Sequence, residues 1–320
     1  MLCAGAVKGA NDMDKQPNNN YSRRQFIGTV LAGTGALVAG PGVSQVQAGR
    51  KSRKGRQITD VVALGKSGIK TTMLAQGTGW RGGARSSAHT RLGEKAFTKL
   101  IRTSLDNGVR LMDMADLYGS HPYIRTALKG VPRDNYNILT KLWPREAFWN
   151  MPSGGAIEEV NRFRKELNTD LLDICLIHCM TDTKWPDTFK RIRDELDEMK
   201  DKGAVKAVGV SCHDLGAVKV AATDPWTDVI LARINNVGKE ALMDGTPEEV
   251  APVLKQARAN GKIVIGMKIF GEGRLTNPEQ KDSSLKYVFE NELVDAITIG
   301  MMEPKHVGDT IKRANKALKA

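Results

Sequence analysis

From Lys70 to the end of the chain, short runs of aliphatic and β-branched residues alternate with longer segments of helical period. Such runs predict strands, and apolar positions spaced three and four apart predict helices. The predicted strands are 71–77, 109–115, 136–142, 171–178, 205–212, 229–236, 263–270 and 295–301. The predicted helices are 93–107, 121–129, 153–168, 185–202, 214–222, 247–260, 278–291 and 303–319.

Strands that are apolar on both faces are typical of parallel sheets covered by helices. Strand and helix units repeated in this way over about 250 residues predict an α/β fold, a closed (β/α)8 TIM barrel. We place this single domain at 59–320. The alternative is an open doubly wound sheet, but the glycine-rich run "GTGWRGGARSS" at 77–87 does not lead directly into a helix, as a dinucleotide fingerprint would.

The first 48 residues have the layout of an export signal, with a polar start, paired arginines, a weakly apolar run at 27–40 and small residues up to Ala48. The apolar run is too short for a membrane span, which needs about 20 residues. The stretch "SRRQFIG" resembles the twin-arginine signal, with Gly28 where Lys is more usual. The resemblance implies that the Tat export machinery moves the folded protein to the periplasm and that 1–48 is cleaved. A basic tail or a membrane anchor is the alternative interpretation.

The chain carries a net charge of +12, part of which lies in 49–58, predicted to be a basic flexible segment. Elsewhere acidic and basic residues are interspersed, and aromatic residues make up 5% of the sequence. Nucleic-acid readers more often combine a basic stripe with stacking aromatics. We therefore expect no nucleic-acid partner and no stable membrane span.

The cysteines predict neither a disulfide framework nor a metal site. Cys175, Cys179 and Cys212 remain after the signal, an odd number, as expected of a protein that folds in a reducing cytoplasm. Cys175 and His178 are an odd number of residues apart on a predicted strand, so they face opposite sides. We expect no bound metal.

Polar side chains close three successive predicted strands: Asp113, Lys141 and His178, with Tyr118 a few residues beyond the first of them. In a (β/α)8 barrel, chemistry lies at the carboxyl ends of the strands. A tyrosine titrates near 10, and a neighbouring lysine ammonium favours the phenolate and lowers this pKa. A carboxylate can hold the lysine in place, and a histidine can orient a carbonyl oxygen. Together the four residues suit proton transfer to or from a carbonyl group.

"NGVRLMDMADLYG", "ILTKLWP" and "TDLLDICLIH" together resemble the aldo-keto reductase superfamily, whose catalytic Asp, Tyr, Lys and His follow in this order. The resemblance covers essentially 60–320. It implies that Asp113, Tyr118, Lys141 and His178 take the four catalytic roles, and it leaves Asp116 in the loop. It also implies a nicotinamide dinucleotide bound across the barrel mouth.

The same resemblance implies the residues that hold this cofactor. Ser211, Cys212 and Asn236 stand where the family holds the carboxamide, with Cys in place of Asn and Asn in place of Gln. The loop "KIFGEGRLT" stands at the pyrophosphate and contributes Lys268, Gly271, Gly273 and Arg274. Beyond the last strand, His306 stands where Arg is common, and Asp309 and Thr310 replace the usual Glu-Asn pair. NADPH is expected from the habit of the family. NADH is the alternative, because a bidentate partner for the 2′-phosphate is missing there.

We therefore expect an NAD(P)-dependent oxidoreductase that interconverts a carbonyl and an alcohol, with Tyr118 as general acid and base and a small aldehyde, ketone or sugar as substrate. One alternative is an enzyme with a permanently bound cofactor that cycles between two sugars. The other is a non-catalytic barrel that binds a nucleotide or has a regulatory role. The departures at Cys212, Asn236 and His306 favour the non-catalytic interpretation.

Overall fold

A computed structural model describes residues 55–145 and 154–319. Eight parallel strands form a closed barrel in the order β10-β3-β4-β5-β6-β7-β8-β9. Their bounds are β3 Leu74–Gly77, β4 Leu111–Asp113, β5 Asn137–Leu142, β6 Leu172–Met180, β7 Val205–Cys212, β8 Val229–Arg233, β9 Ile263–Met267 and β10 Ala296–Ile299. The predicted (β/α)8 barrel is confirmed. The predicted signal at 1–48 lies outside the described residues.

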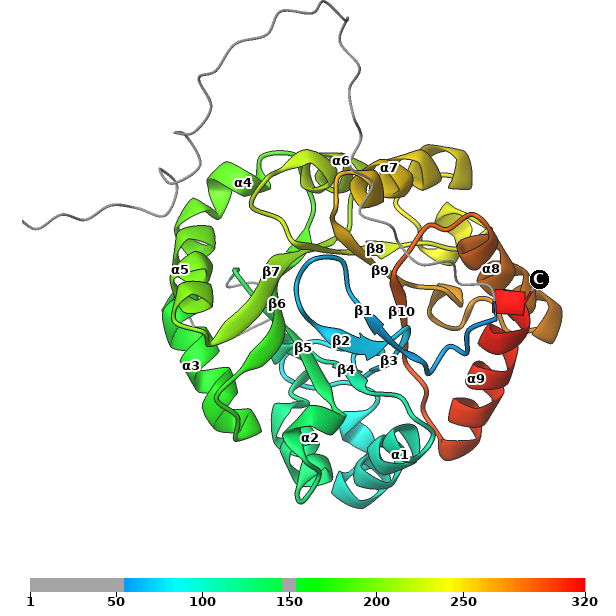
Figure 1. Cartoon of the computed structure of the whole chain (residues 1–320), viewed down its shortest axis with the longest axis horizontal. Helices are drawn as coiled ribbons and strands as arrows, with labels where there is room; N and C mark the ends of the chain where they lie inside the picture. The colour runs from blue at the N-terminus through cyan, green and yellow to red at the C-terminus, as the bar shows by residue number, and fades with distance from the viewer. Residues whose placement is uncertain (1–54, 146–153, 320) are drawn as a thin grey trace, which may run out of the picture. The chain divides into compact units, whose positions relative to one another are not determined.

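Helices surround the barrel (Figure 1). Their bounds are α1 Glu94–Asp106, α2 His121–Leu128, α3 Ala156–Leu167, α4 Trp185–Thr188, α5 Lys190–Asp201, α6 Leu215–Thr223, α7 Pro247–Ala259, α8 Pro278–Glu290 and α9 Pro304–Lys319. Short 3-10 turns occur at η2 Thr90–Leu92, η3 Asp116–Tyr118, η4 Arg133–Asn135, η5 Lys239–Ala241 and η6 Gly271–Gly273. The single helix predicted at 185–202 is divided at Phe189, whose φ of −108° and ψ of 25° separate α4 from α5.

Two apolar layers follow from the two-residue period of the strands. Inward-facing side chains such as Leu111, Leu139 and Leu231 fill the barrel. Outward-facing ones such as Met112 and Ile230 pack with the apolar faces of the helices. The strands are therefore buried on both sides, as their sequences indicate.

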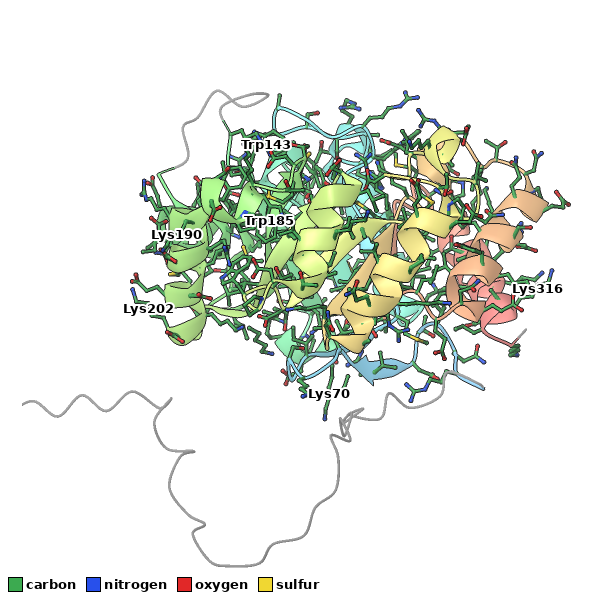
Figure 2. The ribbon with its side chains drawn as sticks, turned by 90° about the horizontal axis from the view of Figure 1, so that it is seen from above. Lys70, Trp143, Trp185, Lys190, Lys202 and Lys316 are labelled. Atoms are coloured by element: carbon green, nitrogen blue, oxygen red, sulfur yellow. The ribbon has the colours of Figure 1, made fainter. Side chains whose placement is uncertain are left out.

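A hairpin precedes the barrel and was not predicted. Its strands are β1 Val61–Ala63 and β2 Lys70–Thr72, paired antiparallel. Leu64 and Ile69 beside its turn pack with the inward-facing residues, so the hairpin covers one end of the barrel. The run 71–77 thus contains the end of β2 and all of β3. Figure 2 shows Lys70 of β2 and Trp143, beyond the carboxyl end of β5, at opposite ends.

Candidate active site

The carboxyl ends of β4, β5 and β6 bring the predicted catalytic side chains together. Asp113, Lys141 and His178 continue the inward-facing positions of Leu111, Leu139 and Leu176 on their strands. All three are buried, with relative exposures of 6%, 1% and 4%. Each strand therefore aims its last inward-facing side chain into the barrel mouth.

Lys141 forms a buried ion pair with Asp113. Lys141 Nζ donates to Asp113 Oδ1 at 2.5 Å and to the carbonyl oxygen of Met114 at 2.8 Å. The other carboxylate oxygen, Oδ2, accepts from Thr298 Oγ1 of β10 at 2.7 Å. Burial lowers the pKa of Lys141, while the Asp113 carboxylate opposes this shift. The pair is fixed from three strands and from the segment after β4.

Tyr118, at the end of η3, lies beside the Lys141–Asp113 ion pair and contacts His178. Its hydroxyl lies 3.4 Å from His178 Nε2, and the two rings pack edge to face. Lys141 Nζ lies 4.9 Å from the centre of the Tyr118 ring. Burial, followed by the Asp113 charge, raises the pKa of Tyr118 well above its usual value.

This direction differs from the lowering expected from the sequence. The ammonium of Lys141 is hydrogen-bonded to Asp113 and Met114. Asp113 therefore offsets the positive charge that was expected to stabilise the phenolate. The Tyr118 phenol is therefore protonated near neutral pH.

His178 is held as a neutral imidazole. Burial and the charge of Lys141, followed by weaker contributions that include Arg145 and Lys268, lower its pKa well below the usual value. The Trp143 ring packs edge to face against it, with ring centres 5.4 Å apart. A neutral histidine beside a protonated phenol can orient a carbonyl oxygen without adding charge.

The glycine-rich run at 77–87 covers Tyr118. A Cβ on Gly79 would lie 2.3 Å from the Tyr118 ring, and one on Gly82 would lie 2.5 Å from it. Gly119, with φ of 63°, leaves no room for a side chain because its Cβ would lie 1.9 Å from the carbonyl oxygen of Arg85. These glycines allow the loop backbone to approach the Tyr118 ring closely.

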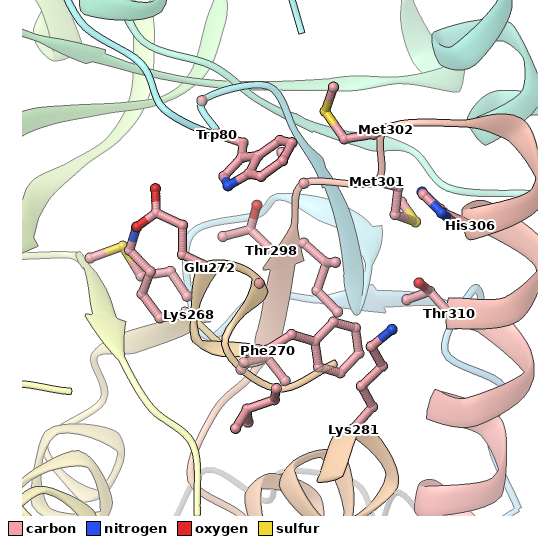
Figure 3. A pocket seen from close by; sticks show the side chains of 18 of the residues that line it. Trp80, Lys268, Phe270, Glu272, Lys281, Thr298, Met301, Met302, His306 and Thr310 are labelled. Atoms are coloured by element: carbon pink, nitrogen blue, oxygen red, sulfur yellow. The ribbon is translucent and has the colours of Figure 1, made fainter. Parts of the chain in front are cut away.

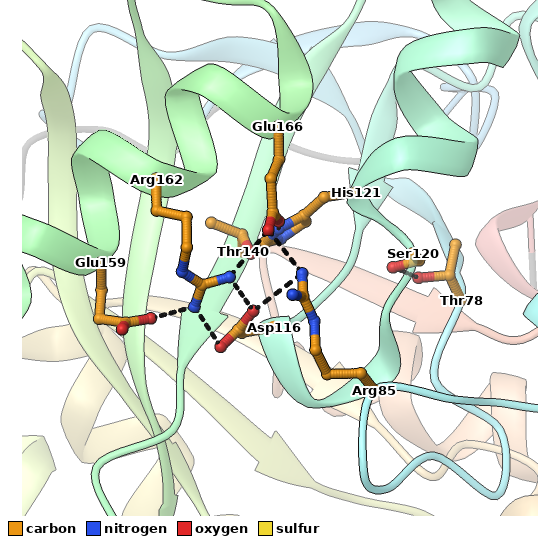
Figure 4. Close-up of polar contacts among 9 residues, drawn as sticks. All are labelled: Thr78, Arg85, Asp116, Ser120, His121, Thr140, Glu159, Arg162 and Glu166. Atoms are coloured by element: carbon orange, nitrogen blue, oxygen red, sulfur yellow. Dashed lines mark hydrogen bonds and ion pairs between the residues drawn. The ribbon is translucent and has the colours of Figure 1, made fainter. Parts of the chain in front are cut away.

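Asp116 belongs to a separate ionic cluster (Figure 4). Its carboxylate binds Arg162 of α3 through two hydrogen bonds, of 2.9 and 2.6 Å. Arg162 also pairs with Glu159 and Glu166, and Arg85 pairs with Glu166 at 2.6 Å. We call these five residues the Asp116 network. It connects η3, α3 and the loop that covers Tyr118.

His121 joins the Asp116 network by binding Glu166 at 2.9 Å and Thr140 at 2.7 Å. Asp116, His121 and Glu166 place potential metal ligands close together. The two carboxylates are, however, already paired with Arg162 and Arg85. These side chains therefore form an ion-pair and hydrogen-bond network with one another.

A pocket at the barrel mouth, here called the mouth pocket, is lined by residues of the barrel strands, their loops, α8 and α9. Asp113 and Tyr118 line it, and Figure 3 shows Lys281, His306 and Thr310 on the side of the pocket opposite Lys268 and Glu272. Among the predicted cofactor residues, those that line it are Lys268, Gly273, His306, Asp309 and Thr310. Lys268 is paired with Glu272 at 2.7 Å, and both residues have positive φ.

The other predicted cofactor residues are not among those that line the mouth pocket: Ser211, Cys212, Asn236, Gly271 and Arg274. Ser211 Oγ accepts from the backbone N–H of Cys179 at 2.8 Å. Cys212 packs in the outer apolar layer, because it faces the opposite way from Ser211 on β7. Arg274 is exposed and donates to the carbonyl oxygen of Gly271. Asn236 lies beyond the end of β8, and its buried Oδ1 has no hydrogen-bond partner among the described residues.

Arg233 is the inward-facing side chain at the end of β8, and it was not predicted from the sequence as a site residue. It follows Val229 and Leu231, both of which face the barrel interior. Arg233 pairs with Asp244 at 3.1 Å and contacts His213, whose ring centre lies 6.4 Å from that of His178. The two-residue period from Val229 was the available signal.

Lys281 was also missed. It lies on α8 and reaches the mouth pocket, with Nζ 5.8 Å from the centre of the Phe270 ring. Figure 3 shows the Lys281 side chain extending from α8 toward the side of the pocket formed by α9, which carries Thr310. In sequence it is one helical lysine among many, and only the packing of α8 beside α9 gives it this position.

None of the helices in the described residues is both long enough and apolar enough to cross a bilayer.

Known proteins resemble the chain both in sequence and in fold. An aldo-keto reductase of Bacillus subtilis, YhdN, is 30% identical over 163 residues, which is 48% of this chain and 46% of that protein. The methylglyoxal reductase DkgB of Salmonella typhi is 28% identical over 128 residues, 38% of this chain and 44% of that protein. The chain thus spans just under half the length of these curated relatives.

Solved structures share the fold at lower sequence identity. An aldo-keto reductase from Bacillus halodurans superposes with a TM-score of 0.63 and 18% identity, covering 81% of this chain and 94% of that one. One from Klebsiella pneumoniae gives a TM-score of 0.56 and 16% identity, covering 78% and 88%. The model of the aldo/keto reductase family matches residues 77–320. The chain therefore belongs to the aldo/keto reductase family.

Proposed function

We propose that this protein is an NAD(P)H-dependent oxidoreductase that interconverts an alcohol with an aldehyde, ketone or sugar carbonyl by hydride transfer. The observation that carries the proposal is the contact of the Tyr118 hydroxyl with His178 Nε2 beside the Asp113–Lys141 pair. Two further findings support it. The DkgB relative is named a methylglyoxal reductase, and the Klebsiella structure is titled as a complex with NADPH.

The residues of the mouth pocket fit a nicotinamide dinucleotide. The pocket continues from Tyr118 past Lys268 and Gly273 to Thr310, which suits an extended ligand. Outside the residues that line the pocket, the buried Oδ1 of Asn236 has no partner among the described residues, and an amide N–H could satisfy it. Lys268 and Gly273 would hold the middle of the cofactor, and the residues on α8 and α9 its far end. When bound, the reduced nicotinamide supplies the hydride.

In the reducing direction, Tyr118 donates the proton. A carbonyl oxygen placed between the Tyr118 hydroxyl and His178 Nε2 gains negative charge as the carbonyl carbon gains the hydride. The phenol proton passes to this oxygen, so the products are an alcohol and the oxidised cofactor. In the oxidising direction, the phenolate removes the same proton from the alcohol.

Lys141 and Asp113 act on Tyr118 after the proton leaves. The ammonium, 4.9 Å from the ring centre, stabilises the phenolate that forms. Asp113 holds the ammonium in place and is itself fixed by Thr298. The Trp143 ring packs edge to face against His178 and supports the position of its imidazole.

A Tyr118→Phe variant tests the assignment. We expect kcat for the reduction of small aldehydes to fall roughly 10²–10⁴-fold, because the general acid is lost, while the fluorescence titration with NADPH or NADH is unchanged. Tyr123→Phe, a partly buried tyrosine on α2 that packs against Phe97, is the control and should keep full activity. A nucleotide-binding protein without turnover in its wild-type form would instead support the non-catalytic barrel.

We also propose export to the periplasm through the Tat machinery, with cleavage of 1–48. The motif Ser22-Arg23-Arg24 and the small residues up to Ala48 support this proposal. Replacing Arg23 and Arg24 by Lys should retain the uncut chain in the cytoplasmic fraction. Equal recovery of the variant and the wild type from the periplasm would contradict the proposal.

A further inference from the structure

We propose that Lys281 binds the phosphate on the ribose 2′ position of NADPH and thereby sets the preference for NADPH over NADH. This inference rests on the proposed function, in which the hydride-transferring end of the cofactor lies beside Tyr118. It moves the phosphate-binding cation from the segment after β10, where the sequence resemblance implies it, to α8.

The lining residues of the mouth pocket indicate which side receives the adenosine half. Tyr118 and Asp113 line the pocket, as do Lys281, His306 and Thr310. Figure 3 shows the last three on the opposite side of the pocket from Lys268 and Glu272. Figure 3 shows the Lys281 side chain reaching from α8 toward the space that α9 borders. A dinucleotide with its nicotinamide at Tyr118 brings its ribose phosphate to the side of the pocket that Lys281, His306 and Thr310 line.

Of the two lysines among the described residues that line the mouth pocket, Lys281 is the one without a carboxylate partner, since Lys268 is paired with Glu272. Arg313 is paired with Asp282 at 2.7 Å and with Asp309 at 2.9 Å, and Lys316 is paired with Asp282 at 3.0 Å. Lys281, by contrast, has no carboxylate partner among the described residues and lies near the Phe270 ring. A lysine ammonium in this position can bind a phosphate as a point charge.

The two cations suggested by the sequence are less suitable. Lys268 lines the pocket, but its ammonium is paired with Glu272. Arg274 is exposed and is not among the residues that line the mouth pocket. The acidic residue at the adenosine end, Asp309, would favour an unmodified ribose hydroxyl, yet Arg313 neutralises it.

The test is a fluorescence titration of the full-length protein with NADPH and with NADH, for the wild type and for Lys281→Met. We expect the wild type to bind NADPH more tightly. In the variant, the Kd for NADPH should rise about ten- to hundredfold, the range for losing one charged contact. The Kd for NADH should change less than about threefold, because NADH lacks the phosphate that Lys281 contacts.

Two further variants sharpen the readout. Lys286→Met removes an exposed charge from the same helix and should leave both dissociation constants unchanged. Lys281→Arg keeps the charge and should keep the preference. The preference of wild type and Lys281→Arg for NADPH should also weaken as salt rises, since the contact is electrostatic.

The outcomes separate the two proposals. If Lys281→Met retains the wild-type preference, or if the wild type prefers NADH, the role of Lys281 is refuted and the oxidoreductase proposal stands. If folded wild-type protein, free of retained nucleotide, binds neither dinucleotide, the proposed function fails as well.

Discussion

Asp113 and Asp116 are buried carboxylates on the same short segment, yet their partners differ. Asp113 pairs with Lys141, whose ammonium also lies over the Tyr118 ring. Asp116 is bound through both terminal nitrogens of Arg162. A buried lysine shifts its pKa readily, whereas an arginine stays charged and binds a carboxylate in a fixed plane. Under the proposed function, the lysine pair serves the transferred proton, whereas the arginine pair connects the segment that carries Tyr118 to α3.

Lys141→Met should produce the largest loss of turnover. Removing the ammonium leaves the Tyr118 phenolate without its stabilising charge, so we expect kcat to fall roughly hundredfold or more. It also leaves Asp113 buried and unpaired, which should lower the free energy of unfolding by about 3 kcal/mol. Steady-state kinetics and urea unfolding measure the two effects.

The double variant Asp113→Asn/Lys141→Met separates the effect on turnover from the effect on stability. Its neutral amide can still accept the hydrogen bond from Thr298, so we expect most of the lost stability to return while kcat stays low. Recovery of kcat together with stability would mean that the pair serves folding alone, and the contrast with the Asp116 network would disappear.

Gly79→Ala should give the next largest effect on turnover. The new methyl group would lie 2.3 Å from the Tyr118 ring, so the ring or the loop must move. Displacing a reacting group by about 1 Å can cost roughly 10²-fold in rate. Gly83→Ala is the matched control, because a Cβ there meets nothing within 4 Å and kcat should be unchanged. Equal kinetics for the two variants would show that the loop does not position Tyr118.

The fold and the convergence of Asp113, Lys141 and His178 at the barrel mouth were predictable because strand periodicity determines both, while their catalytic roles stay predictions. Asp113, Lys141 and His178 end runs whose alternation defines the barrel interior. Arg233 was missed because the predicted strand 229–236 extends beyond β8, which ends at Arg233. The sequence prediction therefore placed the end of this strand at Asn236 instead of Arg233.

Other features depend on tertiary packing, which the hydrophobic pattern of the sequence does not predict. The hairpin was hidden because β2 and β3 are separated only at Met73 inside one apolar run. Asp116 gave no sign of its partners, since Arg162 and Arg85 reach it from distant segments. Lys281 likewise depends on how α8 packs beside α9.

Arg162→Met should affect stability more than chemistry. The substitution removes the cation shared by Asp116, Glu159 and Glu166, and we expect the free energy of unfolding to fall by about 3 kcal/mol. Turnover should fall less than about tenfold, because Tyr118 keeps its contacts with His178 and the covering loop.

The control is Arg164→Met on the same helix, whose partner Asp170 is fully exposed; an exposed pair contributes roughly 0–1 kcal/mol. A loss of kcat as large as that of Lys141→Met, without a loss of stability, would reverse the roles assigned to the two pairs.

The smallest effect expected is the pH dependence of stability contributed by Glu166. Although burial raises the pKa of this carboxyl, hydrogen bonds from His121 and Arg85 lower it to about 2 from an ordinary 4.5. Because the folded-state pKa lies below the unfolded one, this stability is complete above pH 4.5 and is lost as the pH falls toward 2. We expect urea unfolding of wild type to lose of order 1–2 kcal/mol more than Glu166→Gln between pH 5 and pH 3.

Glu240→Gln, which alters an exposed carboxylate on η5, is the matched control and should follow the wild-type curve. If Glu166→Gln also followed it, the arginines would not be holding Glu166 ionised. The Asp116 network would then contribute its stability through packing and not through ion pairs. The contrast between its permanently charged arginines and Lys141 would then have no effect on stability.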